Sequence, residues 1–214
     1  MSDLEGPGVG GSGYSARLIG ITGRARSGKD TVADILVRDH GFAKIAFADH
    51  LKRCCRDIFG FTDEQLWGGE RDVVDERMVF APRYALQRLG TEFGRSLYPN
   101  VWIDPVMRTI ESLRSGWYAY TPQRGLHALE WARAKFRGFV VSDVRFPNEA
   151  EAIRREGGAI WKTAHGAGLR GSAGEHETEQ HVDAIRTDAV VPPGVGLGEL
   201  PWIVASLLHE GAAR

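Results

Sequence analysis

The sequence predicts an α/β fold with three layers, in which a central parallel sheet of about five strands lies between helices. Short apolar runs that suit buried strands alternate along the chain with segments whose apolar residues recur at helical spacing. Strands that alternate with helices pair in parallel through right-handed crossovers. Polar segments follow several of the predicted strands at once, so we expect them to meet at the carboxyl edge of the sheet, where ligands bind.

The first predicted strand, residues 16–22, is an apolar run that leads directly into a glycine loop and a helix with Val32 and Ile35 on its buried side. The loop consists of Gly23, Arg24, Ala25, Arg26, Ser27, Gly28 and Lys29. In such a loop the backbone N–H groups and the helix N-terminus hold phosphate, and the lysine reaches the terminal phosphates of a nucleotide. A glycine-rich turn with a solvated lysine is the alternative, which the flanking strand and helix disfavour.

The loop departs at one position from the usual pattern G-x-x-x-x-G-K-[ST]. Asp30 stands where a hydroxyl residue normally ligates magnesium, and Thr31 comes one residue later. A carboxylate is also a hard oxygen ligand, so Asp30 can hold Mg²⁺ directly or through water. We interpret residues 23–31 as a variant P-loop that binds ATP, and the predicted fold class is therefore a P-loop NTPase.

The next segment predicts a second strand over residues 42–48 and a helix that Asp49 caps. The expected buried side of this helix consists of Leu51, Cys54, Cys55 and Ile58. The two cysteines are interpreted as small core residues rather than as a metal or redox pair. Residues 60–80 form a polar excursion whose structure no pattern fixes.

Residues 82–98 predict a helix that begins at Pro82 and has one apolar and one polar side. The apolar stripe consists of Leu86, Leu89, Phe93 and Leu97. The polar side carries Gln87, Thr91 and Arg95, next to Arg88 and Glu92, which can pair. Arg83, Arg88 and Arg95 can clamp a phosphate bidentately. An ordinary solvated face explains the polar side equally well.

A helix over residues 102–113 follows, then an unassigned segment at 115–127 and a short helix near 126–135. The clear apolar run at 138–142 predicts a buried strand that ends on Asp143. In P-loop proteins an acidic residue at this place commonly lies beside magnesium, whereas the alternative is a plain strand-ending aspartate. Asn148 is expected to cap a helix over 149–156.

The last third of the chain predicts strands at 159–163 and 189–191 and a terminal helix around 200–207. Residues 164–175 are small, polar and rich in glycine, which fits a lid over substrates with Arg170 as its arginine. His176 and His181 do not predict a zinc site, because residues five apart lie about 140° apart around a helix and the zinc motif needs a spacing of four.

The chain has 214 residues, two cysteines and a formal net charge of −1. This length predicts one domain over residues 16–214, and residues 1–15 resemble a disordered tail without a signal peptide. The near-neutral charge disfavours a nucleic-acid polymer or a membrane surface as partner. No apolar stretch is long enough to span a bilayer. Adjacent cysteines do not make a disulfide framework, so we expect the cytoplasm.

Three stretches resemble the deoxynucleoside monophosphate kinases of bacteriophages, within the P-loop group similar to nucleoside monophosphate kinases. They are GRARSGKDTVAD at 23–34, LQRLGTEFGRSLYPNVWID at 86–104 and VVSDVRFPNEAEAIRREGG at 140–158. A weaker match is HETE at 176–179, where the family more often has His-x-Ser-Glu. The resemblance implies transfer of the γ-phosphoryl group of ATP, with Mg²⁺, to a 2′-deoxynucleoside 5′-monophosphate. A phage origin would place the protein in the host cytoplasm.

The resemblance also implies a mobile monophosphate-binding part at about 50–115 and a lid at about 164–180. The catalytic residues that we expect are Lys29, Arg145 and Arg170. The expected magnesium ligands are Asp30 and Asp143. The expected substrate-binding residues are Arg83, Gln87, Arg88, Thr91, Glu92, Arg95, Asp143 and Arg145. The acceptor is a phosphate with a second pKa of about 6, so it is largely dianionic and requires no general base.

Two other classes of function compete with this interpretation. A kinase acting on a hydroxyl group, similar to dephospho-coenzyme-A kinase, would need a carboxylate base, for which Asp49 is the candidate. A nucleotide-binding switch or assembly ATPase would bind ATP without acceptor-dependent turnover. Tyr84, Trp67 and Trp102 are candidates for excluding a 2′-hydroxyl group. The sequence leaves the accepted bases open, and a homodimer is one option for the oligomeric state.

Overall fold

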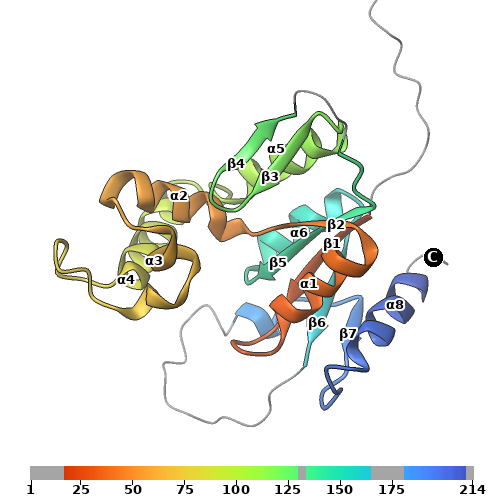
Figure 1. The fold of residues 1–214 in the computed structure, drawn as a ribbon. Helices are drawn as coiled ribbons and strands as arrows, with labels where there is room; N and C mark the ends of the chain where they lie inside the picture. The colour runs from red at the N-terminus through yellow and green to blue at the C-terminus, as the bar shows by residue number, and fades with distance from the viewer. Residues whose placement is uncertain (1–16, 130–133, 165–180, 211–214) are drawn as a thin grey trace, which may run out of the picture.

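The fold is a three-layer α/β sandwich, as the sequence predicts. The computed structural model describes residues 17–129, 134–164 and 181–210. Its central sheet consists of β1 (Arg17–Thr22), β2 (Phe42–Ile45), β5 (Gly138–Val144), β6 (Ala159–Thr163) and β7 (Ala189–Val191). All neighbouring strands pair in parallel, in the order β2-β5-β1-β6-β7 (Figure 1). The first strand of the chain is therefore the central one.

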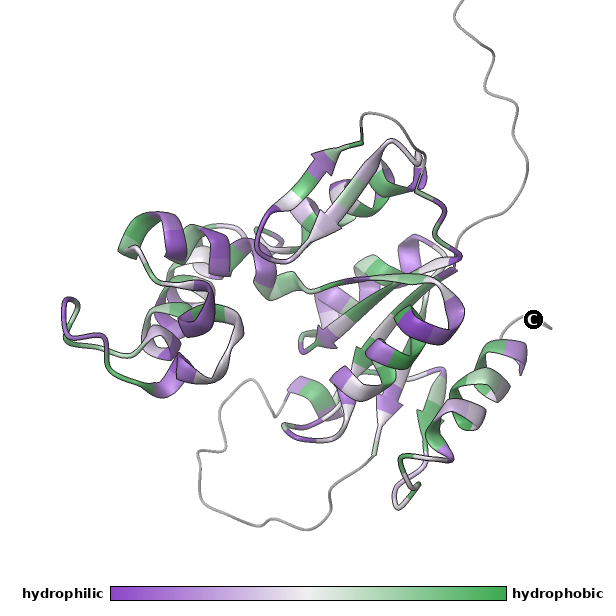
Figure 2. Cartoon of the chain, viewed as in Figure 1, coloured by the Kyte–Doolittle hydropathy of each residue, from purple (hydrophilic) through white to green (hydrophobic). Residues whose placement is uncertain are grey.

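Helices cover both faces of this sheet. Helices α1 (Lys29–His40) and α8 (Leu200–Glu210) pack on one face, and α5 (Ile103–Arg114) and α6 (Pro147–Arg155) pack on the other. Successive strand residues serve opposite cores, since Leu18 packs with α5 and α6 whereas Ile19 packs with α1 and α8. Figure 2 shows the resulting apolar strands between helices with polar outer sides. Burial on both faces explains why these strands are continuous apolar runs.

Helix α2 (Phe47–Phe59) begins before the predicted cap at Asp49, and β2 ends at Ile45 instead of residue 48. Asp49 does cap this helix, but from inside its first turn. One of its carboxylate oxygens accepts the Ala46 N–H at 3.0 Å.

Helix α6 also begins two residues early, at Pro147, and the expected cap at Asn148 is wrong. Glu149 takes that role and accepts the N–H groups of Arg145 and Phe146 at 2.7 and 3.1 Å. Asn148 instead donates to the Pro99 carbonyl oxygen at 3.1 Å. A carboxylate in the first turn outcompetes an asparagine there because it also complements the positive end of the helix.

A side lobe, which we define as residues 47–102, projects from the carboxyl edge of the sheet (Figure 1). It comprises α2, α3 (Asp63–Trp67), a 3₁₀ turn (Gly69–Asp72), α4 (Pro82–Gln87) and a π-helix (Arg88–Arg95). The lobe has its own small core of Leu51, Cys55, Phe61, Leu66, Ala85 and Trp102. Helix α5 belongs to the predicted monophosphate-binding part, but it packs against the central sheet.

Two predicted buried faces of the side lobe are wrong. On α2 only Leu51 and Cys55 are buried, whereas Cys54 is exposed and Ile58 is 62% exposed. The predicted helix 82–98 begins at Pro82 as expected, but it widens into the π-helix, in which i→i+5 hydrogen bonds change the period. Its inner side is therefore formed by Gly90 and Gly94 against Trp102, and two residues of the expected apolar stripe, Phe93 and Leu97, point to solvent.

The unassigned segment at 115–127 contains an antiparallel hairpin of β3 (Tyr118–Thr121) and β4 (Gly125–Ala128). The short helix predicted near 126–135 is wrong at residues 126–128, because the β4 strand occupies them. Strand β5 runs past Asp143 to Val144, with a register shift opposite Gly20–Thr22. The tail at 1–15, most of the predicted lid, Arg170 and His176 lie outside the described residues. Within the described ranges, no helix has the length and apolar content for crossing a membrane.

Candidate active site

The predicted phosphate-binding loop lies at the carboxyl end of the central strand β1. Gly23 is the first loop residue, and a Cβ atom there would come within 2.4 Å of the Thr163 hydroxyl oxygen at the end of β6. Its φ of +150° is also a conformation that side chains rarely adopt. Only glycine fits this position without displacement of the neighbouring strand end.

The loop then turns tightly into α1. The Ser27 N–H donates to the Arg24 carbonyl at 3.2 Å, and Arg26 and Gly28 both have positive φ, at 61° and 86°. The buried Ser27 hydroxyl shares a 2.7 Å hydrogen bond with the Thr163 hydroxyl, which ties the loop to β6. Lys29 is the first residue of α1, so the N–H groups of the first helical turn face the loop. This is the cradle geometry expected of a P-loop.

Lys29 connects this loop to the end of β5. Its ammonium nitrogen donates to the carbonyl oxygens of Gly23 and Arg24 at 2.7 and 2.8 Å, and it lies 4.0 Å from Asp143 Oδ1. That oxygen is buried and accepts no hydrogen bond from any described residue, whereas Oδ2 accepts Arg145 Nε at 2.8 Å. Lys29, Asp143 and Arg145 are thus brought together where two neighbouring strands end.

The two predicted magnesium ligands differ in their surroundings. Asp143 offers a buried oxygen without a hydrogen bond beside the P-loop lysine, which suits a cation. The Asp30 side chain is 81% exposed and pairs with Lys44 of β2 at 3.0 Å. In the part of the chain that the structure describes, no three His, Cys, Asp or Glu side chains group as metal ligands. One carboxylate therefore fits Mg²⁺ well only if phosphate oxygens complete its shell, which is usual for this ion.

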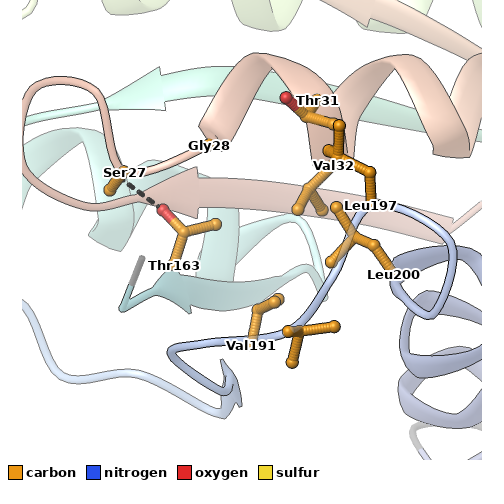
Figure 3. A pocket seen from close by; sticks show the side chains of 9 residues that line it. Ser27, Gly28, Thr31, Val32, Thr163, Val191, Leu197 and Leu200 are labelled. Carbon is orange, nitrogen blue, oxygen red and sulfur yellow. Dashed lines mark hydrogen bonds between the residues drawn. The ribbon is translucent and has the colours of Figure 1, made fainter. Parts of the chain in front are cut away.

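A mostly apolar pocket lies directly beside the P-loop, between α1 and the loop that joins β7 to α8 (Figure 3). Its lining residues are Ser27, Gly28, Thr31, Val32, Thr163, Val191, Val195, Leu197 and Leu200. Figure 3 shows Leu197 and Leu200 opposite Val32 across this space. The pocket offers an apolar surface within one helical turn of the phosphate-binding loop.

The three arginines that we expected to clamp a phosphate each pair with a carboxylate. Arg83 donates to Asp72 at 2.8 Å, and Arg88 pairs with Glu92 as the sequence predicts. Gln87 is half-buried, and Thr91 is exposed on the π-helix. These side chains are spread along α4 and the π-helix, and no single described cluster contains the three arginines.

Arg95 lies in the most enclosed of these pairs. Its guanidinium is 2.5 Å from Glu149 Oε1 and 3.9 Å from the centre of the Phe146 ring. The Arg95 and Glu149 side chains are 15% and 3% exposed. Burial raises the pKa of Glu149, and Arg95 and the Arg145 and Phe146 N–H groups oppose that rise. Arg95 thus joins the side lobe to the segment that carries Asp143 and Arg145.

Sequence reasoning missed two cations of the side lobe, Lys52 and Arg71. Among the described residues neither forms an ion pair, and the Arg71 Nε atom is buried without a hydrogen bond. Burial lowers the pKa of Lys52, while the charges of Asp49 and Asp143 act in the opposite direction. The Lys52 ammonium therefore interacts with the charge of Asp49 in the side lobe and with that of Asp143 at the carboxyl edge of the sheet. Its position three residues after Asp49, at the end of a predicted strand, was the available signal.

Trp102 is an unsuitable candidate for contact with a sugar, because it lies in the core of the lobe and donates to the Gly90 carbonyl at 2.9 Å. Trp67 is half-buried and Tyr84 is 53% exposed, so both remain candidates.

The glycine loop, its lysine and an acidic residue at the end of the adjacent parallel strand define a P-loop α/β protein. A protein of Acanthamoeba polyphaga mimivirus named "Putative deoxynucleotide monophosphate kinase" is 34% identical to this chain over 148 residues. The match covers 68% of this chain and 72% of the mimivirus protein. The chain therefore belongs to the deoxynucleotide monophosphate kinase family.

No family model matches the chain. Among solved structures, TT1252 from Thermus thermophilus aligns with 91% of this chain and 97% of its own, at 21% sequence identity and a TM-score of 0.47. That likeness is too weak to carry a functional conclusion.

Proposed function

We propose that this protein transfers the γ-phosphoryl group of ATP to a 2′-deoxynucleoside 5′-monophosphate and releases ADP and the deoxynucleoside diphosphate. The observation that carries this proposal is the contact of Lys29 with the P-loop carbonyls, 4.0 Å from an Asp143 oxygen that accepts no hydrogen bond. Membership of the family supports the choice of a nucleotide as acceptor.

The donor site in this proposal is the loop Gly23–Thr31 and the apolar pocket beside it. Backbone N–H groups of the loop and of the first turn of α1 bind the triphosphate, and Lys29 exchanges its two carbonyl partners for phosphate oxygens. The pocket with Val32, Leu197 and Leu200 takes the adenine base. Asp143 would hold Mg²⁺ together with the phosphates, and the ion would supply charge neutralisation.

The acceptor site lies between the sheet edge and the side lobe. An oxygen of the acceptor phosphate forms the new bond to the γ-phosphorus, and the bond from that phosphorus to the β–γ bridging oxygen breaks, with ADP as leaving group. The acceptor is already dianionic, so no proton has to be removed. Positive charge and alignment are what the protein must supply. We assign this role to Arg145, Lys52 and Arg71, and we expect Arg170 of the predicted lid to contribute.

The competing hydroxyl kinase would need Asp49 as a general base. Both oxygens of that carboxylate already accept hydrogen bonds, from Ala46 N–H, Trp67 Nε1 and the Tyr120 hydroxyl, at 2.9–3.0 Å. A carboxylate with three donors and 3% exposure is not accessible to the hydroxyl group of a substrate. This observation favours a phosphate acceptor over an alcohol.

A coupled assay of ADP release tests the proposal. The assay uses ATP and Mg²⁺ with each of dAMP, dGMP, dCMP and dTMP, and with AMP and dephospho-coenzyme A as competing acceptors. Turnover that depends on at least one deoxynucleoside monophosphate, and that is lost in Lys29→Ala, is the expected result. Turnover with dephospho-coenzyme A alone, or ATP hydrolysis that no acceptor stimulates, would overturn it.

A further inference from the structure

The hairpin β3–β4 lies against the first turns of α2, and it reaches a carboxylate that is buried there. Asp49 is 3% exposed, and it collects three donors from three separate segments. They are the Ala46 N–H at 3.0 Å, the Trp67 indole Nε1 at 3.0 Å and the Tyr120 hydroxyl at 2.9 Å. A buried carboxylate is tolerated only when its lone pairs are satisfied, so each donor is held in place by the others.

Trp67 contacts both Asp49 and the cation Lys52. The indole N–H is fixed by Asp49, and the ring lies between Lys52 Nζ at 5.4 Å and the Arg56 guanidinium at 5.8 Å. Lys52 and Arg56 are one helical turn apart on α2, so the ring packs along one side of that helix. No carboxylate among the described residues pairs with Lys52, whereas the Trp67 ring lies within cation–π distance of its ammonium.

Arg53 makes a second set of contacts between α2 and the hairpin, and it shares the Tyr120 hydroxyl with Asp49, since that hydroxyl accepts Arg53 Nη1 at 3.4 Å. Arg53 donates to the Pro122 carbonyl at 2.7 Å, and its guanidinium lies 5.7 Å from the centre of the Tyr120 ring. At Gly125 a Cβ atom would lie 3.3 Å from Arg53 Cζ, so the turn side of the hairpin closes over this guanidinium. The Tyr120 hydroxyl is protonated at neutral pH and can donate, and burial raises its pKa further.

We propose that Tyr120 and Asp49 are positioning residues of the acceptor site, through which the hairpin β3–β4 fixes Trp67 and Lys52 for binding the acceptor's phosphate. The chemistry of the ligand is that of a phosphate monoester dianion, which a cation on a constrained side chain recognises. This inference rests on the proposed function, because it names how the acceptor site of that reaction is held. The hairpin then acts on the acceptor site through Asp49 and Trp67.

The test compares Tyr120→Phe with Tyr118→Phe. Both substitutions remove one hydroxyl group from β3, and the Tyr118 hydroxyl has no contact with Asp49. In Tyr120→Phe we expect the KM for the monophosphate to rise about tenfold, since a hydrogen bond to a buried charge is lost, while the KM for ATP changes less than about twofold. Tyr118→Phe should leave both constants unchanged. A rise in both KM values alike in Tyr120→Phe would overturn the inference, because a general loss of structure affects both substrates.

A double-mutant cycle with Lys52→Ala tests whether Tyr120 acts through that lysine. Once Lys52 is absent, the substitution Tyr120→Phe should add less than about twofold to the KM for the monophosphate. Additive effects of the two substitutions on this KM would contradict the proposal that Tyr120 acts on Lys52 through Asp49 and Trp67. Arg53→Gln provides a second variant that loosens the hairpin without removing a donor of Asp49, and it should shift the same constant in the same direction.

The two proposals fail differently. If the wild-type protein turns over no deoxynucleoside monophosphate, the proposed function fails. If the wild-type protein is active but Tyr120→Phe behaves like Tyr118→Phe, the proposed function stands and the positioning role is wrong.

Discussion

The P-loop and the side lobe contribute to one candidate active site, but they are built in different ways. The P-loop is one contiguous stretch whose backbone forms the site, and it is fixed at the centre of the sheet between β5 and β6. The side lobe depends on side chains from segments far apart in sequence, since Asp49 and Trp67 of the lobe are joined by Tyr120 of the hairpin β3–β4. Apart from α2 its helices are short, and two of its elements are a 3₁₀ turn and a π-helix. A site made of backbone can be recognised from a motif, whereas a site made of distant side chains cannot.

The largest predicted effect on activity is that of Lys29→Ala in the P-loop. The variant should lose about 10³-fold in turnover, because a counter-charge of the transferred phosphoryl group disappears from an enclosed site. Its thermal unfolding should change little, since the contacts described for the ammonium, with two loop carbonyls and Asp143, lie within the phosphate-binding site. Arg38→Ala, which removes an exposed cation from the same helix, serves as the control. Equal turnover in both variants would remove Lys29 from the site.

Arg95→Ala addresses the junction between the lobe and the sheet. Removal of one partner from a buried ion pair leaves the other charge uncompensated, so we expect a loss of about 3 kcal/mol in the free energy of unfolding. Arg88→Ala breaks an exposed pair on the same helix and should cost less than about 1 kcal/mol. Urea denaturation monitored by circular dichroism measures both. Equal losses would show that Arg95 and Glu149 do not form a buried pair in solution.

Asp143→Asn and Asp30→Asn separate the two predicted magnesium ligands. The Mg²⁺ concentration for half-maximal turnover should rise about tenfold in Asp143→Asn, because the loss of an oriented carboxylate weakens metal binding by at least this factor. The change in Asp30→Asn should be smaller, because that side chain pairs with Lys44. Titration of Mg²⁺ at saturating ATP measures the half-maximal concentration for both variants. A larger rise in Asp30→Asn than in Asp143→Asn would identify Asp30 as the principal magnesium ligand.

The smallest predicted effect concerns His50 in the first turn of α2. Burial, with the charge of Arg53, lowers its pKa from 6.5 to about 4. The unfolded chain therefore binds a proton more readily than the folded chain, so the folded state loses stability as pH falls from 6.5 toward 4. With allowance for partial solvent screening we expect a loss of about 1 kcal/mol between pH 7 and pH 5.

Denaturation of His50→Gln at the two pH values measures this contribution. The variant should lose less stability than the wild type over the interval, whereas exposed His209→Gln should follow the wild type. If His50→Gln retains the full acid loss, another group is responsible for it.

The sequence was sufficient for the parts of the molecule in which local pattern and global fold agree. The five sheet strands, the P-loop and the meeting of polar segments at the carboxyl edge follow from alternating apolar runs and one motif. Element ends were less exact, because Asp49 and Glu149 cap their helices from the third helical position rather than from the N-cap. Which residue caps a helix depends on which side chain reaches the free N–H groups of its first turn, and this is not visible in the sequence pattern.

Two features, the π-helix of the side lobe and the hairpin β3–β4, could not be predicted from periodicity. The π-helix changes the repeat after Arg88, so Phe93 moves to the solvent side. The hairpin segment has no strong alternation, because Tyr118 and Thr121 are exposed, whereas Tyr120 is half-buried and donates to Asp49 of α2, 71 residues away in sequence. Pairings across that distance leave no local signal.

The most direct test of this account is a crystal structure with a non-hydrolysable ATP analogue. We predict that its β- and γ-phosphates accept hydrogen bonds from backbone N–H groups within residues 23–31, with Lys29 Nζ shifted from the carbonyls of Gly23 and Arg24 to the phosphates. Placement of the triphosphate away from this loop would contradict the account.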